Sequence, residues 1–96
     1  MIDTVDTYFD IGRDAGEAST WKRIFYHDAD DSSLIWHRDK HDRKITVVKG
    51  VGWQLQLDNQ LPEYMWVGQS YIIPAMTYHR VIKGKNDLHL FIRELK

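Results

Sequence analysis

Short apolar runs alternate with polar turn residues along most of the chain. In the clearest run Trp53, Leu55 and Leu57 alternate with two glutamines. Successive side chains of a strand point to opposite faces, so this period of two predicts a half-buried strand. Similar runs rich in Val, Ile, Trp and Tyr predict strands at residues 21–27, 34–39, 44–48, 52–58, 63–67, 69–74, 78–82 and 88–95. This pattern is typical of an all-β domain.

Turn residues separate these runs at spacings of roughly 8–12 residues, which favours a sandwich or jelly-roll barrel. Polar segments at 28–33 and 58–62, together with Gly68 and Pro74, end successive runs. Only residues 10–22 are ambiguous, because they could hold a helical turn but include a glycine. Two hydrophobic cores do not fit into 96 residues, so residues 1–96 are expected to form a single domain.

Composition and charge exclude several classes of function. A 43% hydrophobic share with 28% charged residues is ordinary for a globular protein, so extensive disorder is not expected. The formal charge is −1 and the basic residues are scattered, which predicts no nucleic-acid partner and no membrane partner. There is no cysteine, so any metal must be bound by histidine and carboxylate ligands. The chain lacks a signal-peptide pattern and an apolar run of about 18 residues, so we expect a cytoplasmic protein.

Three residues form a candidate metal site. His37 and Asp39 are two positions apart on a predicted strand, so their side chains leave the same face. His79 belongs to another predicted strand and can join them only if the sheet closes on itself. A group of two histidines and one carboxylate binds Fe(II) or a similar ion and leaves positions open for substrate. On spacing alone, an exposed polar pair on a turn is the simpler interpretation of His37 and Asp39.

Two longer spaced patterns surround these residues. They read Asp31-x5-His37-x-Asp39-x3-Arg43-x6-Gly50 and Gly68-x5-Pro74-x-Met76-x2-His79-x3-Lys83. Their spacing resembles the two motifs of the cupin superfamily, G-x5-H-x-H-x3,4-E-x6-G and G-x5-P-x-G-x2-H-x3-N. The first motif covers about residues 31–50 and the second about residues 68–83, with a short gap between them. Two motifs that keep both their spacing and their order are hard to obtain by chance.

The resemblance implies a small cupin, a jelly-roll barrel also called a double-stranded β-helix, with about seven to nine strands. It implies that His37, Asp39 and His79 hold a divalent metal such as Fe, Mn, Ni or Zn, with Asp39 in place of a histidine. His41 has the same parity and is a reserve ligand. Cupins include metal-dependent oxygenases, isomerases and lyases as well as binding proteins, so the specific activity stays open.

Arg43 is the main departure, because it stands where cupins carry a glutamate. It removes an oxygen ligand and adds a fixed positive charge, which disfavours a metal. A guanidinium group can instead hold a carboxylate or phosphate through two parallel hydrogen bonds. We therefore predict that Arg43 binds a small anionic ligand together with Gln54 and Tyr71. A structural salt bridge is the alternative for Arg43, while a glutamine on such a strand more often faces water and an aromatic residue such as Tyr71 is more often core packing.

Two further interpretations remain open from the sequence. One is a metal-free cupin that binds carbohydrate or acts like an epimerase, since a cation at position 43 is tolerable when no metal is present. The other is a non-enzymatic interaction module. In each case the expected partners are a small-molecule ligand and a second copy of the chain in a homodimer, because exposed sheet edges invite pairing.

Overall fold

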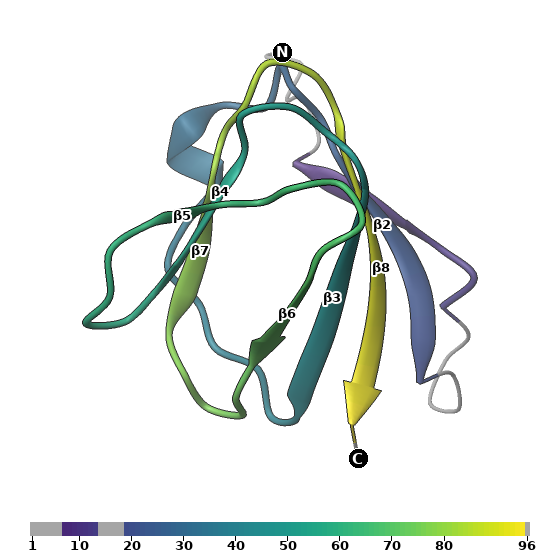
Figure 1. The fold of residues 1–96 in the computed structure, drawn as a ribbon, viewed down its shortest axis with the longest axis vertical. Coiled ribbons are helices and arrows are strands. Elements are labelled where there is room, and N and C mark those ends of the chain that lie inside the picture. The colour runs from purple at the N-terminus through teal and green to yellow at the C-terminus, as the bar shows by residue number, and fades with distance from the viewer. Residues whose placement is uncertain (1–6, 14–18, 96) are drawn as a thin grey trace, which may run out of the picture.

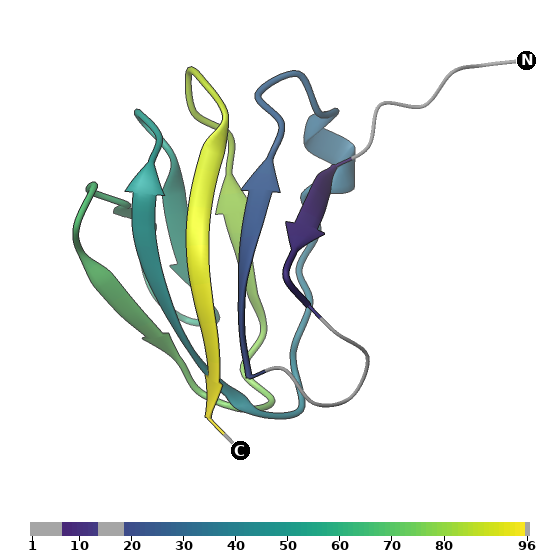
Figure 2. The same cartoon turned by 90° about the vertical axis from the view of Figure 1, so that its right-hand side faces the viewer.

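The computed structural model describes residues 7–13 and 19–95, which form two antiparallel sheets. The five-stranded sheet has the order β1-β2-β8-β3-β6 and the three-stranded sheet the order β5-β4-β7. Figures 1 and 2 show the two sheets facing each other as the walls of a barrel. The strands are β1 (Tyr8–Ile11), β2 (Thr20–Phe25), β3 (Asp42–Lys49), β4 (Gln54–Leu57), β5 (Glu63–Tyr64), β6 (Ser70–Ile73), β7 (His79–Ile82) and β8 (Leu88–Leu95). The predicted all-β class is confirmed.

The barrel core is made by the strand residues that share the inward parity. On β3 the buried Ile45 and Val47 alternate with exposed or half-exposed neighbours, as a period of two requires. The largest fully buried side chains are Trp53, Leu55, Met65, Leu88 and Val47.

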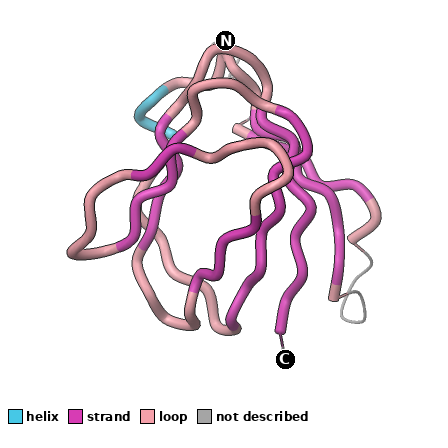
Figure 3. Tube along the Cα trace, viewed as in Figure 1, coloured by secondary structure: helices cyan, strands magenta, loops and turns pink. Residues whose placement is uncertain are grey.

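Figure 3 shows that loops gather at the two ends of the strands. No helix in the described part of the chain has the length and apolar character needed to cross a membrane.

The predicted strand at residues 34–39 is wrong. A short 3-10 helix, η1 (Asp31–Ser33), precedes this segment, and only His37 pairs with β7, through a single bridge to His79. On the Asp39 side of this bridge a turn follows Pro74: the Thr77 N–H donates to the Pro74 carbonyl at 3.3 Å, and the Asp39 carbonyl accepts from the Met76 N–H at 2.7 Å instead.

The two ends of the sequence differ from the predictions in smaller ways. Strand β1 was not predicted, and the ambiguous stretch 10–22 contributes its first two residues to β1 and its last three to β2. Residues 14–18, the rest of the stretch in which a helical turn was considered, lie outside the described residues. The run at 63–67 forms a strand only over its first two residues, although the Met65 N–H still donates to the Trp53 carbonyl at 2.9 Å.

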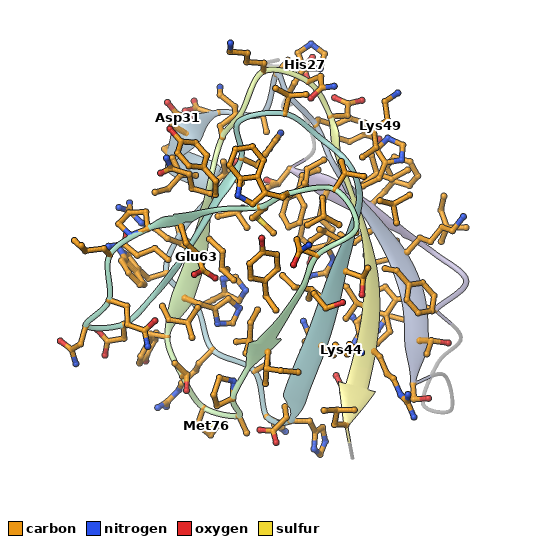
Figure 4. All side chains as sticks on the ribbon, in the orientation of Figure 1. His27, Asp31, Lys44, Lys49, Glu63 and Met76 are labelled. Carbon is orange, nitrogen blue, oxygen red and sulfur yellow. The ribbon has the colours of Figure 1, made fainter. Side chains whose placement is uncertain are left out.

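One end of the barrel is closed by interlocking loops. His27 and Met76 lie at opposite ends of the molecule (Figure 4). At the His27 end, the Val51 N–H donates to Asn86 Oδ1 at 2.8 Å, and Trp53 Nε1 donates to the Asn86 carbonyl at 2.6 Å. The His27 N–H donates in turn to Asp87 Oδ1 at 2.8 Å. These bonds join three loops and fix Trp53 over the core.

Replacing Gly84 by alanine should destabilise the fold through this closed end. A Cβ at position 84 would overlap the Val51 carbonyl oxygen and the Trp53 ring and would lie 2.6 Å from the Trp53 backbone nitrogen. Because two of these neighbours are backbone atoms, we expect Gly84→Ala to lower the free energy of unfolding, measured in urea, by about 3 kcal/mol. Gly12→Ala is the control: its φ is +81° but its Cβ meets open space, so only the backbone cost of about 1–2 kcal/mol applies. A smaller loss in Gly84→Ala than in Gly12→Ala would contradict this packing.

Candidate metal centre

His37, Asp39 and His79 converge, and the candidate ligand atoms of the three side chains lie within 4.8 Å of one another. The His37 N–H donates to the His79 carbonyl at 3.0 Å, and the His79 N–H donates to the His37 carbonyl at 2.8 Å. Opposed residues of an antiparallel pair point to the same face, so the two rings meet with centroids 4.2 Å apart. Asp39 has the same parity as His37, and its Oδ2 lies 3.4 Å from Nε2 of His79.

Backbone carbonyls orient both imidazole rings. Nδ1 of His37 lies 3.1 Å from the Ile35 carbonyl oxygen, and Nδ1 of His79 lies 2.8 Å from the Thr77 carbonyl oxygen. A carbonyl can only accept, so these contacts assign the proton of each neutral ring to Nδ1 and leave a lone pair on Nε2. This arrangement is typical of metal-binding histidines, whose second nitrogen donates to a carbonyl or carboxylate.

Asp39 faces His79 without a hydrogen bond on the nearer oxygen. Its Oδ2 is buried and lacks a hydrogen-bond partner among the described residues. With the His79 proton on Nδ1, Oδ2 and Nε2 are two electron-pair donors 3.4 Å apart, an unfavourable contact unless a proton or a cation lies between them. The group therefore has the chemical character of a cation site.

The pKa values of two groups favour the states that ligands need. Partial burial of the ring, together with the neighbouring His79, lowers the pKa of His37 despite the Ile35 carbonyl, so His37 is neutral near pH 7. Burial alone would raise the pKa of Asp39, but the contact with His79, which is favourable when Nε2 of His79 carries a proton, and the charge of Arg43 outweigh it and hold that pKa below its usual value. Asp39 is thus a carboxylate at neutral pH.

Arg43 lies beside the three residues and bridges two acidic groups. Its Nη1 is 3.3 Å from Asp39 Oδ1, and its Nη2 is 3.3 Å from Glu94 Oε2. The bend at residues 40–41 brings Arg43 back toward Asp39, as its predicted role requires. The Arg43 guanidinium group contacts Oδ1 of Asp39, whereas Oδ2 of the same carboxylate faces His79.

A cavity of about 450 Å³ opens beside the site, within the size range of about 300–1,000 Å³ of small-ligand pockets. Its charged wall includes Arg23, which is only 6% exposed and holds Asp10 through Nε and Nη2 at 2.7 and 3.0 Å. The cavity is lined by apolar Phe25, Leu34, Ile35 and Val81, by polar Thr7, Tyr8 and Ser33, and by charged or ionisable Arg13, Arg23, His37, Asp39 and Arg43.

The other predicted site residues lie apart from this cavity. His41 is exposed and lies outside the three-residue group. Gln54 has the outward parity of β4, opposite to buried Leu55. The Tyr71 hydroxyl donates to the Tyr64 carbonyl at 2.9 Å and accepts from the Trp66 N–H at 3.1 Å. Neither Gln54 nor Tyr71 lines the cavity, and their assignment as ligand contacts stays a prediction.

Arg23, Asp10 and Glu94 were missed from the sequence, although strand parity could have revealed two of them. Arg23 shares the inward parity of the core residues Trp21 and Phe25, and Glu94 shares that of Leu90 and Ile92. A charged residue at an inward position must be paired, so each indicates a buried polar cluster. Asp10 had no comparable signal, because its strand was not predicted.

Solved structures of similar fold were found at low sequence identity. A cupin-2 domain containing protein from Shewanella frigidimarina matches with a TM-score of 0.64 and 16% identity over 99% of this chain and 85% of its own. A putative mannose-6-phosphate isomerase from Ralstonia eutropha matches with a TM-score of 0.65 and 14% identity over 93% and 82%. The Fe(II) form of HppE matches with a TM-score of 0.64 and 14% identity over 92% of this chain and 48% of that one.

No model of a known protein family matches the chain, and no curated protein matches it. At these identities the solved structures show the fold and leave the activity open. The two facing sheets, the spacing of the two motifs and these matches agree with one another. The chain therefore has the cupin fold, as its motifs predict.

Proposed function

We propose that the chain binds one divalent metal ion through Nε2 of His37, Nε2 of His79 and the Asp39 carboxylate. The observation that carries this proposal is the buried Asp39 Oδ2, which has no hydrogen-bond partner among the described residues and lies 3.4 Å from Nε2 of His79. Both histidines have their second nitrogen on a carbonyl, which supports the same assignment. Two histidines and one carboxylate form the donor set that Fe(II) takes in non-haem oxygenases, so Fe(II) is the first candidate, before Mn, Ni or Zn.

The cavity supports a small anionic molecule as the second ligand of this centre. When bound, the ion supplies a Lewis acid or, as Fe(II), a site for oxygen chemistry. Arg43 keeps Asp39 ionised and oriented, while Phe25 and Leu34 shield one side of the cavity from water. Such a centre suits oxygenase, isomerase or lyase chemistry on a small substrate. HppE was solved with Fe(II) and an alternative substrate, which supports the cofactor by analogy alone.

Metal titration tests the proposal. Protein purified without a histidine tag should bind one Fe(II), Mn(II), Ni(II) or Zn(II) ion per chain in calorimetry, under anaerobic conditions for Fe(II). His79→Ala removes a direct ligand, so affinity should fall by more than about 100-fold, since losing even an outer partner costs about 10–100-fold. His41→Ala is the matched control, because His41 is exposed and outside the group. No stoichiometric metal, or equal affinity in His79→Ala, would reject the proposal.

A metal-free binding site is the second candidate. The contact that favours it is the 3.3 Å ion pair between Arg43 and Asp39, which already satisfies one carboxylate oxygen without a metal. In that case small acids or sugars should raise the melting temperature in the presence of a chelator. Loss of ligand binding on adding the chelator would favour the metal centre instead.

A further inference from the structure

The outer surface of the three-stranded sheet carries a set of aromatic and guanidinium groups that the metal centre does not use. Buried Leu55 and His79 point into the barrel, so their neighbours on β4 and β7 point outward. The segment beside β7 extends this surface, because His37 pairs with His79. Figure 1 shows this layer on the side away from the five-stranded sheet. We call its exposed or half-exposed side chains the outer face: Trp36, Arg38, Tyr64, Trp66, Tyr78 and Arg80.

Each of two aromatic rings is matched with an arginine across the bridge. Pairing of His37 with His79 sets Trp36 opposite Arg80 and Arg38 opposite Tyr78. The Arg80 guanidinium lies 5.0 Å from the centroid of the Trp36 ring, and that of Arg38 lies 5.1 Å from the Tyr78 ring. These cation–π contacts, together with an Arg80 Nε hydrogen bond of 2.9 Å to Gln56, hold the guanidinium groups in place.

Within the described part of the chain, the two arginines of the outer face have no acidic partner. Among residues 7–13 and 19–95, no carboxylate lies within 4.0 Å of Arg38 or Arg80. Arg13, Arg23 and Arg43 each have such a partner at 2.7–3.6 Å. The outer face therefore presents two oriented positive charges, which are complementary to carboxylates on a partner.

The aromatic groups extend this charged region into a platform. Tyr64 and Trp66 are 51% and 63% exposed, and their ring centroids are 5.5 Å apart. Gln54 pairs with Tyr64 and presents an outward amide between the two aromatic groups. Three strand spacings separate Trp36 from Tyr64, which is about 14 Å at about 4.8 Å each. A single ligand that covers both ends must be an extended chain.

We propose that the outer face binds an acidic oligosaccharide, a chain of sugar rings that carry carboxylate groups. The exposed rings of Trp36, Tyr64 and Trp66 offer flat apolar surfaces for the C–H faces of the sugars. The amides of Gln54 and Gln56 offer donors and acceptors to the hydroxyl groups. Arg38 and Arg80 bind the carboxylates. The three kinds of side chain thus each find a partner on one ligand.

Charge argues against two other occupants of the outer face. A second copy docked face to face would bring four unpartnered guanidinium groups together, and like charges across an interface are costly. A nucleic acid requires more cations than this surface has, because strong binding typically neutralises about 6–10 phosphates. Two arginines on a chain of net charge −1 match a partner with sparser negative charge.

Calorimetry with defined oligosaccharides tests this site. Hexamers of galacturonate and of glucuronate should bind saturably at low salt, whereas the neutral galactose hexamer should bind much more weakly. Arg38→Gln/Arg80→Gln removes two charge-assisted contacts and should weaken binding by about tenfold or more. Trp66→Ala should weaken it several-fold. Failure of both acidic hexamers to bind, or equal binding by the double arginine variant, would overturn the proposal.

Controls separate the outer face from the rest of the molecule. Phe91→Ala and Arg93→Gln change exposed residues of the same kinds on the five-stranded sheet and should leave hexamer affinity unchanged. His79→Ala should bind the acidic hexamers like the wild type, so this site and the metal centre can fail independently. If a glutamate hexapeptide or a thymidine oligonucleotide binds as tightly as the uronate hexamers, the oligosaccharide assignment is wrong.

Discussion

Replacing Trp53 by alanine is expected to remove a large part of the stability of the fold. Trp53 is fully buried, its ring centroid lies 5.9 Å from that of Phe25, and its Nε1 donates to the Asn86 carbonyl at 2.6 Å. Truncating a buried tryptophan costs about 3–5 kcal/mol. Since small domains are stable by only about 5–15 kcal/mol, the variant should unfold at much lower urea concentration or fail to fold at room temperature.

Trp66 provides the matched control for this prediction. It is the same residue type but is 63% exposed, so Trp66→Ala should change the free energy of unfolding by no more than about 0.5 kcal/mol. Trp53→Phe keeps an aromatic ring but loses the hydrogen bond, and we expect an intermediate loss. Similar losses in Trp53→Ala and Trp66→Ala would show that Trp53 does not have its central place in the core.

Strand parity explains why the fold could be predicted well. Alternation in β4 identified Leu55 as inward, and it is buried. The same rule applied to β2 would have shown Arg23 pointing into the barrel.

The strand predicted at 34–39 failed for a different reason. Its apolar residues have the right composition, but on the Asp39 side the turn after Pro74 takes the Thr77 N–H out of the ladder, and the Asp39 carbonyl accepts from the Met76 N–H instead. Such competition for a backbone donor is decided by tertiary contacts.

The candidate site was only partly accessible from the sequence. Spacing placed His37 and Asp39 on one face, and the motif resemblance added His79 across 40 residues of chain, which no local pattern could do. The structure brings all three together through one backbone bridge. The acidic partners of the arginines were not accessible, because Glu94 meets Arg43 only through the pairing of β3 with β8.

The outer face is an example of information that is visible only after pairing is known. Trp36 and Arg80 are 44 positions apart in the sequence, and neither occupies a specified position of the two motifs. In the structure they are opposed through the same bridge that assembles His37 and His79. One backbone contact therefore sets up two surfaces, with candidate metal ligands on the inner side and cation–π pairs on the outer side.

Replacing Arg43 by glutamine is expected to tighten metal binding and to weaken the metal-free fold. Arg43 neutralises Asp39 and contacts Glu94, and its side chain is only 10% exposed. Removing one partner of largely buried ion pairs costs up to about 3–5 kcal/mol. The positive charge of Arg43 also repels a divalent ion bound at Asp39. This repulsion is similar in size to that cost, since unit charges about 4 Å apart interact by about 4 kcal/mol at a protein surface. After screening, we expect affinity to rise by about tenfold or more.

The measurement compares metal affinity and melting temperature in the wild type, Arg43→Gln and Arg43→Lys. Saturating metal should raise the melting temperature more in Arg43→Gln than in the wild type, because the ion replaces the missing positive charge beside Asp39. Arg43→Lys keeps the charge and should bind metal no more tightly than the wild type. If Arg43→Gln binds metal no better than Arg43→Lys, then Arg43 does not compete with the ion for Asp39. In that case the 3.3 Å contact between Arg43 and Asp39 would serve to orient the ligand.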